Sequence, residues 1–346
     1  MDSNFKHIQL ETGEEFYVIC DVYAEDDLTQ FMRTRDPAII VDIGPTYYKE
    51  EIYNPALFLV PRWIENDASY YYNDEFSDVV ETKSTFNFMI NKSNIHRYVL
   101  IKLLEAMNFT TDFYTFSGVD NFYTDQLKIL GKYYIHQLTN LPNDIAGELV
   151  NPIKTLPKFY TDENSIVTDT FVTSSNDNSP AYNHNNYHRY LKQNFESTAV
   201  ALISESVVND KQASDHCIHF SEKTLFSILG LNFPIWVGGY AQADNWKNLG
   251  FDVFDNVINH SYQYKNTLLE RCYYALFDNR HILEDITLAS NLRKQYMDRL
   301  LKNRDLLLSG HLNYVIKTEA EKLPRNIADY IQQTKTIWFD TFDSKS

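Results

Sequence analysis

Residues 85–116 read TFNFMINKSNIHRYVLIKLLEAMNFTTDFYTF, and their pattern changes from strand to helix and back to strand. The short apolar run 85–90 predicts a buried strand. Residues 95–107 place apolar side chains on one helical face, with Ser93 or Asn94 as a candidate helix cap. Residues 113–116 predict a second strand. Strand, helix and strand in this order form a βαβ unit, which requires a parallel sheet.

The same alternation continues on both sides of this unit. Further strands are expected at 15–23, 38–43, 56–60, 198–204, 233–237 and 251–254. Further helices are expected at 222–231, 244–249, 265–283 and 288–308. The pattern weakens between residues 138 and 194, where the polar run SSNDNS at 174–179 is typical of a linker. We therefore expect an α/β protein with two doubly wound, Rossmann-like domains facing each other across a cleft, at 1–175 and 176–346.

Composition limits the classes of function. The chain has 346 residues, which is more than a single domain with one hydrophobic core usually contains. Its formal net charge of -16 repels phosphate backbones and argues against a general nucleic-acid binder. Its 3 widely spaced cysteines indicate a reducing compartment. The polar start and the shortness of every apolar run predict no signal peptide and no membrane span, so a cytoplasmic protein is expected.

Three short runs in the C-terminal half carry candidate binding chemistry: LISES at 202–206, FSEKT at 220–224 and FPIWVGG at 233–239. Glu222, in the first turn of an expected helix, can accept hydrogen bonds from both hydroxyls of a ribose. Lys223 carries a compact positive charge suited to a diphosphate, and the helix start adds free N–H groups. Ser221 is placed to cap the helix or to donate to a phosphate. Taken alone, these residues form a simple helix cap more often than a binding site.

Two glycines follow the strand expected at 233–237. Gly238 and Gly239 would let the main chain approach a ligand closely, although a Gly-Gly pair alone is typical of an ordinary turn. The ordered set of Glu205 after a strand, Glu222-Lys223 at a helix start and then Gly238-Gly239 is what favours a binding site.

These runs resemble the donor-binding region of the fucosyltransferases of the α-1,3 type. In that family a strand ending in a Glu-Asn-Ser-like step precedes a Thr-Glu-Lys helix and a Val-Pro-Val-Val-x-Gly-like strand. Residues 249–262 also resemble uncharacterised phage and bacterial glycosyltransferase-like proteins. The resemblance covers about 65 residues. Ser206 stands where the fucosyltransferases carry Asn, so the resemblance does not extend to GDP-fucose as the donor.

The resemblance implies the GT-B architecture, with residues 176–346 binding a nucleotide-sugar and residues 1–175 on the acceptor side. It implies that Glu222 holds the ribose and Lys223 the diphosphate, and that Glu205 lies near the sugar or the nucleotide. The other donor-binding residues would be Ser221, Thr224, Gly238 and Gly239. It implies no metal and no cofactor beyond the nucleotide-sugar co-substrate.

A second group of candidates lies in the N-terminal half. Asn91 and Lys92 follow an expected strand and are candidates for a phosphate or acceptor contact, as is Arg97 in the following helix turn. His96 is a candidate base. A similar step occurs in the uncharacterised glycosyltransferase-like proteins, while a solvated, capped helix start is the competing interpretation.

Two further candidates stand near other expected strands. Asp120 follows the strand expected at 113–116 and is either a cleft residue or a turn residue. Arg189, just before the strand expected at 198–204, is a candidate phosphate contact.

The expected function is therefore transfer of a sugar from a nucleotide-sugar to a hydroxyl acceptor, expected to be a glycan, with inversion and without a metal. The catalytic base would come from His96, Asp120 or Glu205. One alternative is an inactive nucleotide-binding or structural protein with the same fold. Another is a phage enzyme that attaches sugar to nucleic acid, against which the charge of -16 counts.

Overall fold

The computed structural model describes residues 5–9, 15–19, 40–42, 46–48, 52–53, 81–90, 94–116, 122–151, 192–205, 217–219 and 222–311. The chain forms two compact units. Unit 1 comprises Met1–Asn73, Asp215–Phe220 and Leu307–Ser346, and unit 2 comprises Asp74–Ser214 and Ser221–Leu306.

Unit 2 is built on a four-stranded sheet in the order β10-β8-β6-β7. The strands are β6 (Ser84–Ile90), β7 (Tyr114–Phe116), β8 (Thr198–Ile203) and β10 (Phe233–Trp236). Every pair of neighbours is parallel. Side chains of β6 and β8 are buried along almost their whole length, as expected of strands covered on both faces.

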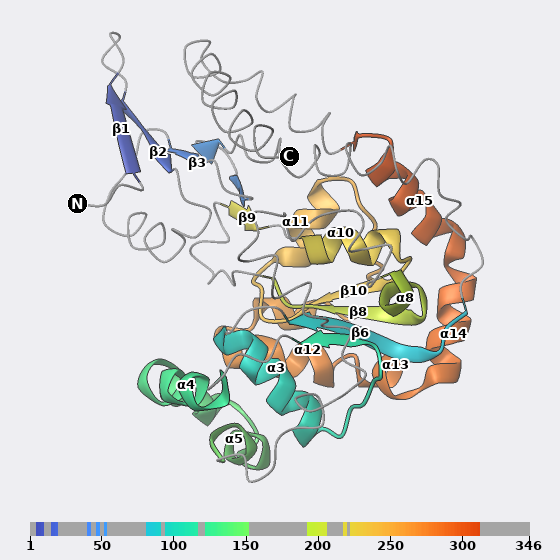
Figure 1. Ribbon diagram of the computed structural model, residues 1–346, viewed down its shortest axis with the longest axis horizontal. Helices are drawn as coiled ribbons and strands as arrows, with labels where there is room; N and C mark the ends of the chain where they lie inside the picture. Colours follow the sequence, from blue (N-terminus) through green and yellow to red (C-terminus); the bar gives the residue numbers. More distant parts are fainter. Residues whose placement is uncertain are drawn as a thin grey trace, which may run out of the picture. The chain divides into compact units, whose positions relative to one another are not determined.

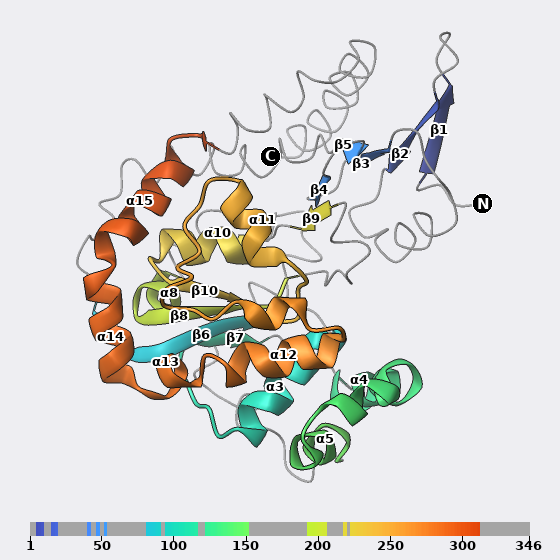
Figure 2. The same ribbon diagram turned by 180° about the vertical axis from the view of Figure 1, so that it is seen from behind.

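Helices cover both faces of this sheet (Figure 1). On one side lie α10 (Glu222–Leu229) and α11 (Gln242–Asn248), and on the other lie α3 (Ile95–Ala106) and α12 (Leu268–Phe277). Figure 2 shows the same layers from behind. The predicted α/β class with a parallel sheet is therefore confirmed for unit 2.

The remaining helices of unit 2 surround these layers. They are α4 (Phe122–Ile129), the π-helical turn η2 (Leu130–Tyr134), the 3₁₀ helix η3 (Ile135–Asn140), α5 (Asn143–Val150), α8 (Lys192–Glu196), the 3₁₀ helix η5 (Ser261–Tyr264), α13 (Arg280–Glu284), α14 (Ile286–Gln295) and α15 (Met297–Leu308). None of the helices in the described ranges is long and apolar enough to cross a membrane.

The expected division at 175/176 differs from this arrangement. Strand β6 pairs with β8, so residues from both sides of that boundary share one sheet and one core. The reason is physical: hydrophobic periodicity identifies a strand but carries no information about which strand becomes its neighbour. The arrangement of two doubly wound domains that face each other across a cleft stays a prediction.

The prediction of a strand at 251–254 was wrong. Asp252 and Asn303 exchange two hydrogen bonds, from the Asp252 N–H to Asn303 Oδ1 at 2.9 Å and from Asn303 Nδ2 to the Asp252 carbonyl at 2.7 Å. The Asp252 carboxylate accepts the Phe254 N–H at 2.8 Å, and Phe254 takes a positive φ of 61°. Side chains rather than a neighbouring strand satisfy this backbone, so the segment is an ordered loop.

The two long helices expected near the C-terminus are each divided. The segment 265–283 becomes α12 and α13, because the buried Asn279 donates to the carbonyls of Ala275 and Asn259, at 3.0 and 3.1 Å, and fixes the break. The segment 288–308 becomes α14 and α15. Gly250, with a φ of 93°, follows α11, and its N–H donates to the carbonyl of Lys247.

Unit 1 contains a sheet of β1 (Phe5–Gln9), β2 (Glu15–Ile19), β3 (Ile40–Asp42) and β5 (Ile52–Tyr53). Its order is β1-β2-β3-β5, with β1 and β2 antiparallel and the other two pairs parallel. A separate antiparallel pair joins β4 (Thr46–Tyr48) to β9 (Cys217–His219). The strands expected at 15–23 and 38–43 thus contain β2 and β3, and the strand expected at 56–60 lies outside the described residues.

Candidate functional site

The carboxyl ends of β6, β8 and β10 meet at one edge of the sheet, because the three strands are parallel and adjacent. This edge is where ligands bind in open α/β sheets. Helix α3 follows β6, Ser204 and Glu205 follow β8, and Gly238 follows β10. We call this set of segments the carboxyl edge.

Glu205 is buried at this edge, and its carboxylate is held from two elements. The Thr224 hydroxyl of α10 donates to Glu205 Oε1 at 2.5 Å. The Trp236 indole of β10 donates to Thr224 Oγ1 at 3.0 Å. These two linked hydrogen bonds fix the orientation of the Glu205 carboxyl group.

His96 and Arg97, in the first turn of α3, are both buried and bind the main chain that leaves β8. His96 Nε2 lies 2.8 Å from the carbonyl oxygen of Glu205. Because a carbonyl only accepts, His96 Nε2 carries the proton. Arg97 Nη2 donates to the carbonyls of Ser204 and Glu205, at 3.3 and 3.2 Å. Both side chains therefore position the Ser204-Glu205 step.

Lys223 and Thr224 lie in the first turn of α10. Lys223 is only 3% exposed, and Thr224 is fully buried. Glu222 begins the helix, but its side chain lies outside the described residues. The start of α10, which was predicted to bind a diphosphate, therefore lies next to Glu205, because Thr224 of this turn donates to the Glu205 carboxylate.

Two glycines, Gly238 and Gly239, follow β10 at this edge. Gly238 adopts a φ of 89°, which few other residues tolerate. A side chain at Gly239 would bring its Cβ within 3.3 Å of Gln242. The backbone angle at Gly238 and the lack of space beside Gly239 therefore both favour glycine.

Arg271 of α12 is a residue of this edge that the sequence interpretation missed. Its Nε donates to the Gly238 carbonyl at 2.7 Å, and its Nη1 donates to the Lys265 carbonyl at 3.1 Å. The side chain is buried and lies 5.9 Å from the ring of Tyr240. A signal existed in the sequence, since helical spacing places Arg271 on the apolar face with Leu268 and Ala275.

The structure brings together four of the predicted residues, His96, Arg97, Glu205 and Thr224, through the contacts given above. Lys223, Gly238 and Gly239 lie on the adjoining elements. Asn91, Lys92, Asp120, Arg189 and Ser221 lie outside the described residues. Within the described ranges, no three His, Cys, Asp or Glu residues are grouped as a metal site requires.

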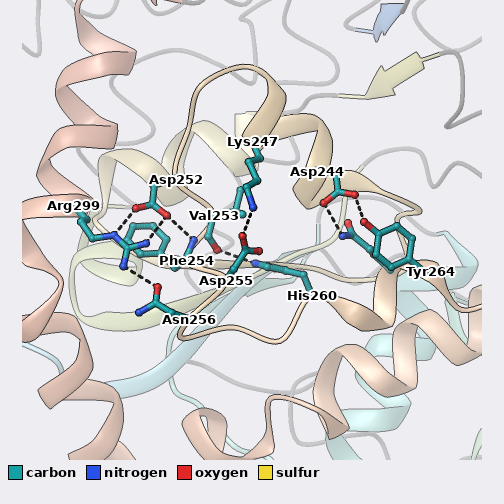
Figure 3. A network of polar contacts seen from close by, with 11 residues as sticks. Asp244, Lys247, Asp252, Val253, Phe254, Asp255, Asn256, His260, Tyr264 and Arg299 are labelled. Carbon is teal, nitrogen blue, oxygen red and sulfur yellow. Dashed lines mark hydrogen bonds and ion pairs between the residues drawn. The ribbon is translucent and has the colours of Figure 1, made fainter.

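A polar network orders the loop between α11 and α12 (Figure 3). Arg299 binds both carboxylate oxygens of Asp252, at 2.5 and 2.7 Å, and donates to Asn256 at 2.8 Å. Lys247 pairs with Asp255. These contacts of Arg299 and Lys247 could not be predicted from the sequence, because the loop conformation brings the partners together.

A hollow of about 420 Å³ opens beside this network, lined by Asp244 of α11, by residues 255–261, by Gln263 and Tyr264, and by His281. His260 lies in its wall, buried, with Nε2 donating to the Val253 carbonyl at 2.8 Å. Burial lowers the pKa of His260, and the hydrogen bond to Val253 opposes this only in part. The imidazole is therefore held in its neutral form.

No protein-family model, curated protein or solved structure matches this chain. The family resemblance accordingly rests on the sequence runs that carry it.

Proposed function

We propose that this protein is a glycosyltransferase that moves a sugar from a nucleotide-sugar to a hydroxyl acceptor. The observation that carries the proposal is the carboxyl edge, where Glu205 is oriented by Thr224 and Trp236 beside the start of α10. Ligands of open α/β sheets bind at this place. The described residues of the three runs that resemble a donor-binding region, 202–205, 222–224 and 233–239, belong to β8, α10, β10 and the segments that follow the two strands.

In this proposal the donor lies along the start of α10. Lys223 neutralises the diphosphate together with the free N–H groups of the helix start, and Glu222 accepts hydrogen bonds from the ribose. Gly238 and Gly239 allow the nucleotide to approach the main chain. Arg271 holds the Gly238 carbonyl in place and so preserves the path of this turn.

The reaction needs one bond broken and one formed at the anomeric carbon. The acceptor oxygen attacks, the diphosphate leaves with the electron pair of its bond to the sugar, and a base takes the acceptor proton. Among the candidates His96, Asp120 and Glu205, His96 donates from Nε2 to a carbonyl and so positions the edge. Glu205 has an oriented carboxylate that lies beside the proposed donor.

The GT-B architecture belongs to the same proposal. Parallel strands occur in unit 1 as well as in unit 2, in the pairs β2–β3 and β3–β5. Two units with parallel strands are what such an enzyme requires, one for the donor and one for the acceptor side.

A titration of the full chain with GDP, UDP, ADP and CDP by calorimetry tests the proposal. We expect one of these nucleoside diphosphates to bind, and the matching nucleotide-sugar to raise the apparent stability of the protein. Absence of binding by all four at millimolar concentration would defeat the donor site.

One observation favours a second function, nucleotide binding without turnover. His96 and Arg97 direct their described hydrogen bonds to main-chain carbonyls, as residues that stabilise a loop do. Incubation of the protein with the nucleotide-sugar that binds separates the two functions. Release of the nucleoside diphosphate supports the transferase, and binding without any release supports the second function.

A further inference from the structure

The hollow beside α11 has a wall rich in hydrogen-bond acceptors. Asp244 accepts from the hydroxyl of Tyr264 and from Gln263 Nε2. Asp255 accepts from Lys247 (Figure 3). An ionised carboxylate offers about four acceptor positions, so each of these groups retains capacity after binding its partners. The hollow therefore suits an occupant that brings donors.

His260 adds a hydrogen-bond acceptor that has no donor among the described residues. The side chain is 6% exposed, and Nε2 donates to the Val253 carbonyl, which leaves Nδ1 of the neutral ring as an acceptor. Nδ1 has no hydrogen-bond partner among the described residues. A buried acceptor without a donor carries a free-energy cost. Nδ1 is enclosed by protein atoms, so a donor on an occupant of the hollow reaches it only if the wall moves.

The described side chains favour hydroxyl groups over a cation as those donors. Asp255 is already paired with Lys247, and Asp244 is already bonded to two neutral donors. The ring of Tyr264 is 48% exposed and lines the hollow, with the Tyr240 ring edge-on at 6.0 Å. An apolar ring face beside a set of acceptors fits a sugar, which has both a carbon face and hydroxyl groups.

The hollow also adjoins the carboxyl edge. The His260 ring lies 5.9 Å from the ring of Trp236, and Trp236 donates to the hydroxyl that holds Glu205. We propose that this hollow binds a neutral carbohydrate. This binding does not depend on the proposed function.

Saturation-transfer NMR of the full chain with a panel of neutral mono- and disaccharides tests the inference without any nucleotide. We expect binding of at least one saccharide. Tyr264→Ala should weaken it tenfold or more, since the ring and the partner of Asp244 are both lost. Tyr264→Phe keeps the ring and should retain most of the affinity. Tyr133→Ala is the matched control, because Tyr133 is 55% exposed on η2 and lies outside the hollow.

Three results would overturn the inference. They are no saccharide binding by the wild type, equal affinity in folded Tyr264→Ala, and binding of methylammonium in place of the saccharides. Calorimetry with nucleoside diphosphates on the same variants separates the two proposals. Diphosphate binding without saccharide binding defeats the hollow alone, and saccharide binding without diphosphate binding defeats only the donor site.

Discussion

The two ends of the sheet in unit 2 both hold a buried arginine, and the arginines serve different segments. At the amino ends of β8 and β10, Arg293 donates to the carbonyls of Gly230, Leu231 and Glu196, at 2.6, 3.0 and 2.7 Å. At the carboxyl ends, Arg97 donates to the carbonyls of Ser204 and Glu205. Arg293 joins the loops that enter the strands, and Arg97 holds a segment that leaves one.

This difference separates stability from binding. In open α/β sheets ligands lie at the carboxyl ends of the strands, so the amino end is free to be closed by satisfied hydrogen bonds. Asn232 extends that closure by donating to the carbonyls of Phe195 and Thr198. The carboxyl edge instead carries an oriented carboxylate and two glycines. Changes at the amino end should lower stability alone, and changes at the carboxyl edge should alter ligand binding.

Arg293→Ala should produce the largest effect. It leaves several buried carbonyls without a donor, each costing about 1–3 kcal/mol, so the free energy of unfolding should fall by about 3 kcal/mol or more. Urea unfolding measures this. Arg280→Ala is the matched control, since Arg280 is exposed and forms an ion pair with Glu284 of a type worth about 0.3–0.5 kcal/mol. A loss below 1 kcal/mol for Arg293→Ala would contradict the structural role.

Lys223→Ala tests the other end. A charge-assisted contact with phosphate contributes about 1.5–3 kcal/mol, so affinity for the nucleoside diphosphate should fall about tenfold to a hundredfold. Affinity for the nucleoside should stay unchanged. Calorimetry with both ligands measures the difference, and Lys128→Ala, an exposed lysine on α4, is the control. Equal losses for both ligands would show that Lys223 has no role at the phosphates.

Thr224→Val keeps the shape of the side chain and removes its hydroxyl. The indole of Trp236 loses its acceptor and Glu205 loses its donor, so stability should fall by about 1–3 kcal/mol. Nucleoside diphosphate affinity should also decrease, because Glu205 is no longer oriented. If urea unfolding shows the stability loss while calorimetry shows full affinity, the Thr224–Glu205 contact is structural only.

His260 should give the smallest effect, as a dependence of stability on pH. Its pKa in the folded state lies below the unfolded value of about 6.5, so the unfolded chain binds more protons between the two values. Stability from this group is therefore full above about pH 6.5 and is lost as the pH falls toward the folded pKa. Urea unfolding from pH 7 to pH 5 should show a smaller decrease for His260→Gln than for the wild type. An identical decrease in both proteins would contradict this assignment.

The local elements of unit 2 could be predicted from the sequence, whereas their pairing could not. β6, α3, β7, β8, α10 and β10 all lie where periodicity placed them. Periodicity gave no reason to pair β6 with β8, which are separated by about a hundred residues in the sequence. The short and mostly apolar run FDVF at 251–254 was predicted to be a strand. Its conformation depends on Asn303 of α15, which local pattern cannot reveal.

The candidate site, like the fold, could be predicted only in part. His96 and Arg97 were assigned to the acceptor-side domain and Glu205 and Thr224 to the donor-binding domain, whereas the structure brings all four together at one edge of one sheet. Their partners were not foreseen, because a hydrogen bond to a main-chain carbonyl leaves no trace in the sequence. Arg271 and Trp236 were not singled out, because the sequence interpretation placed them only within an expected helix and an expected buried strand.

Hydrogen–deuterium exchange with and without the nucleoside diphosphate that binds tests most directly whether the donor lies at the carboxyl edge. The account predicts slower amide exchange at residues 222–226 and 236–240 when the ligand is present. It predicts no local change at residues 193–197 and 230–232, where Arg293 closes the opposite end. Slowing at the amino end, or none at the start of α10, would contradict it.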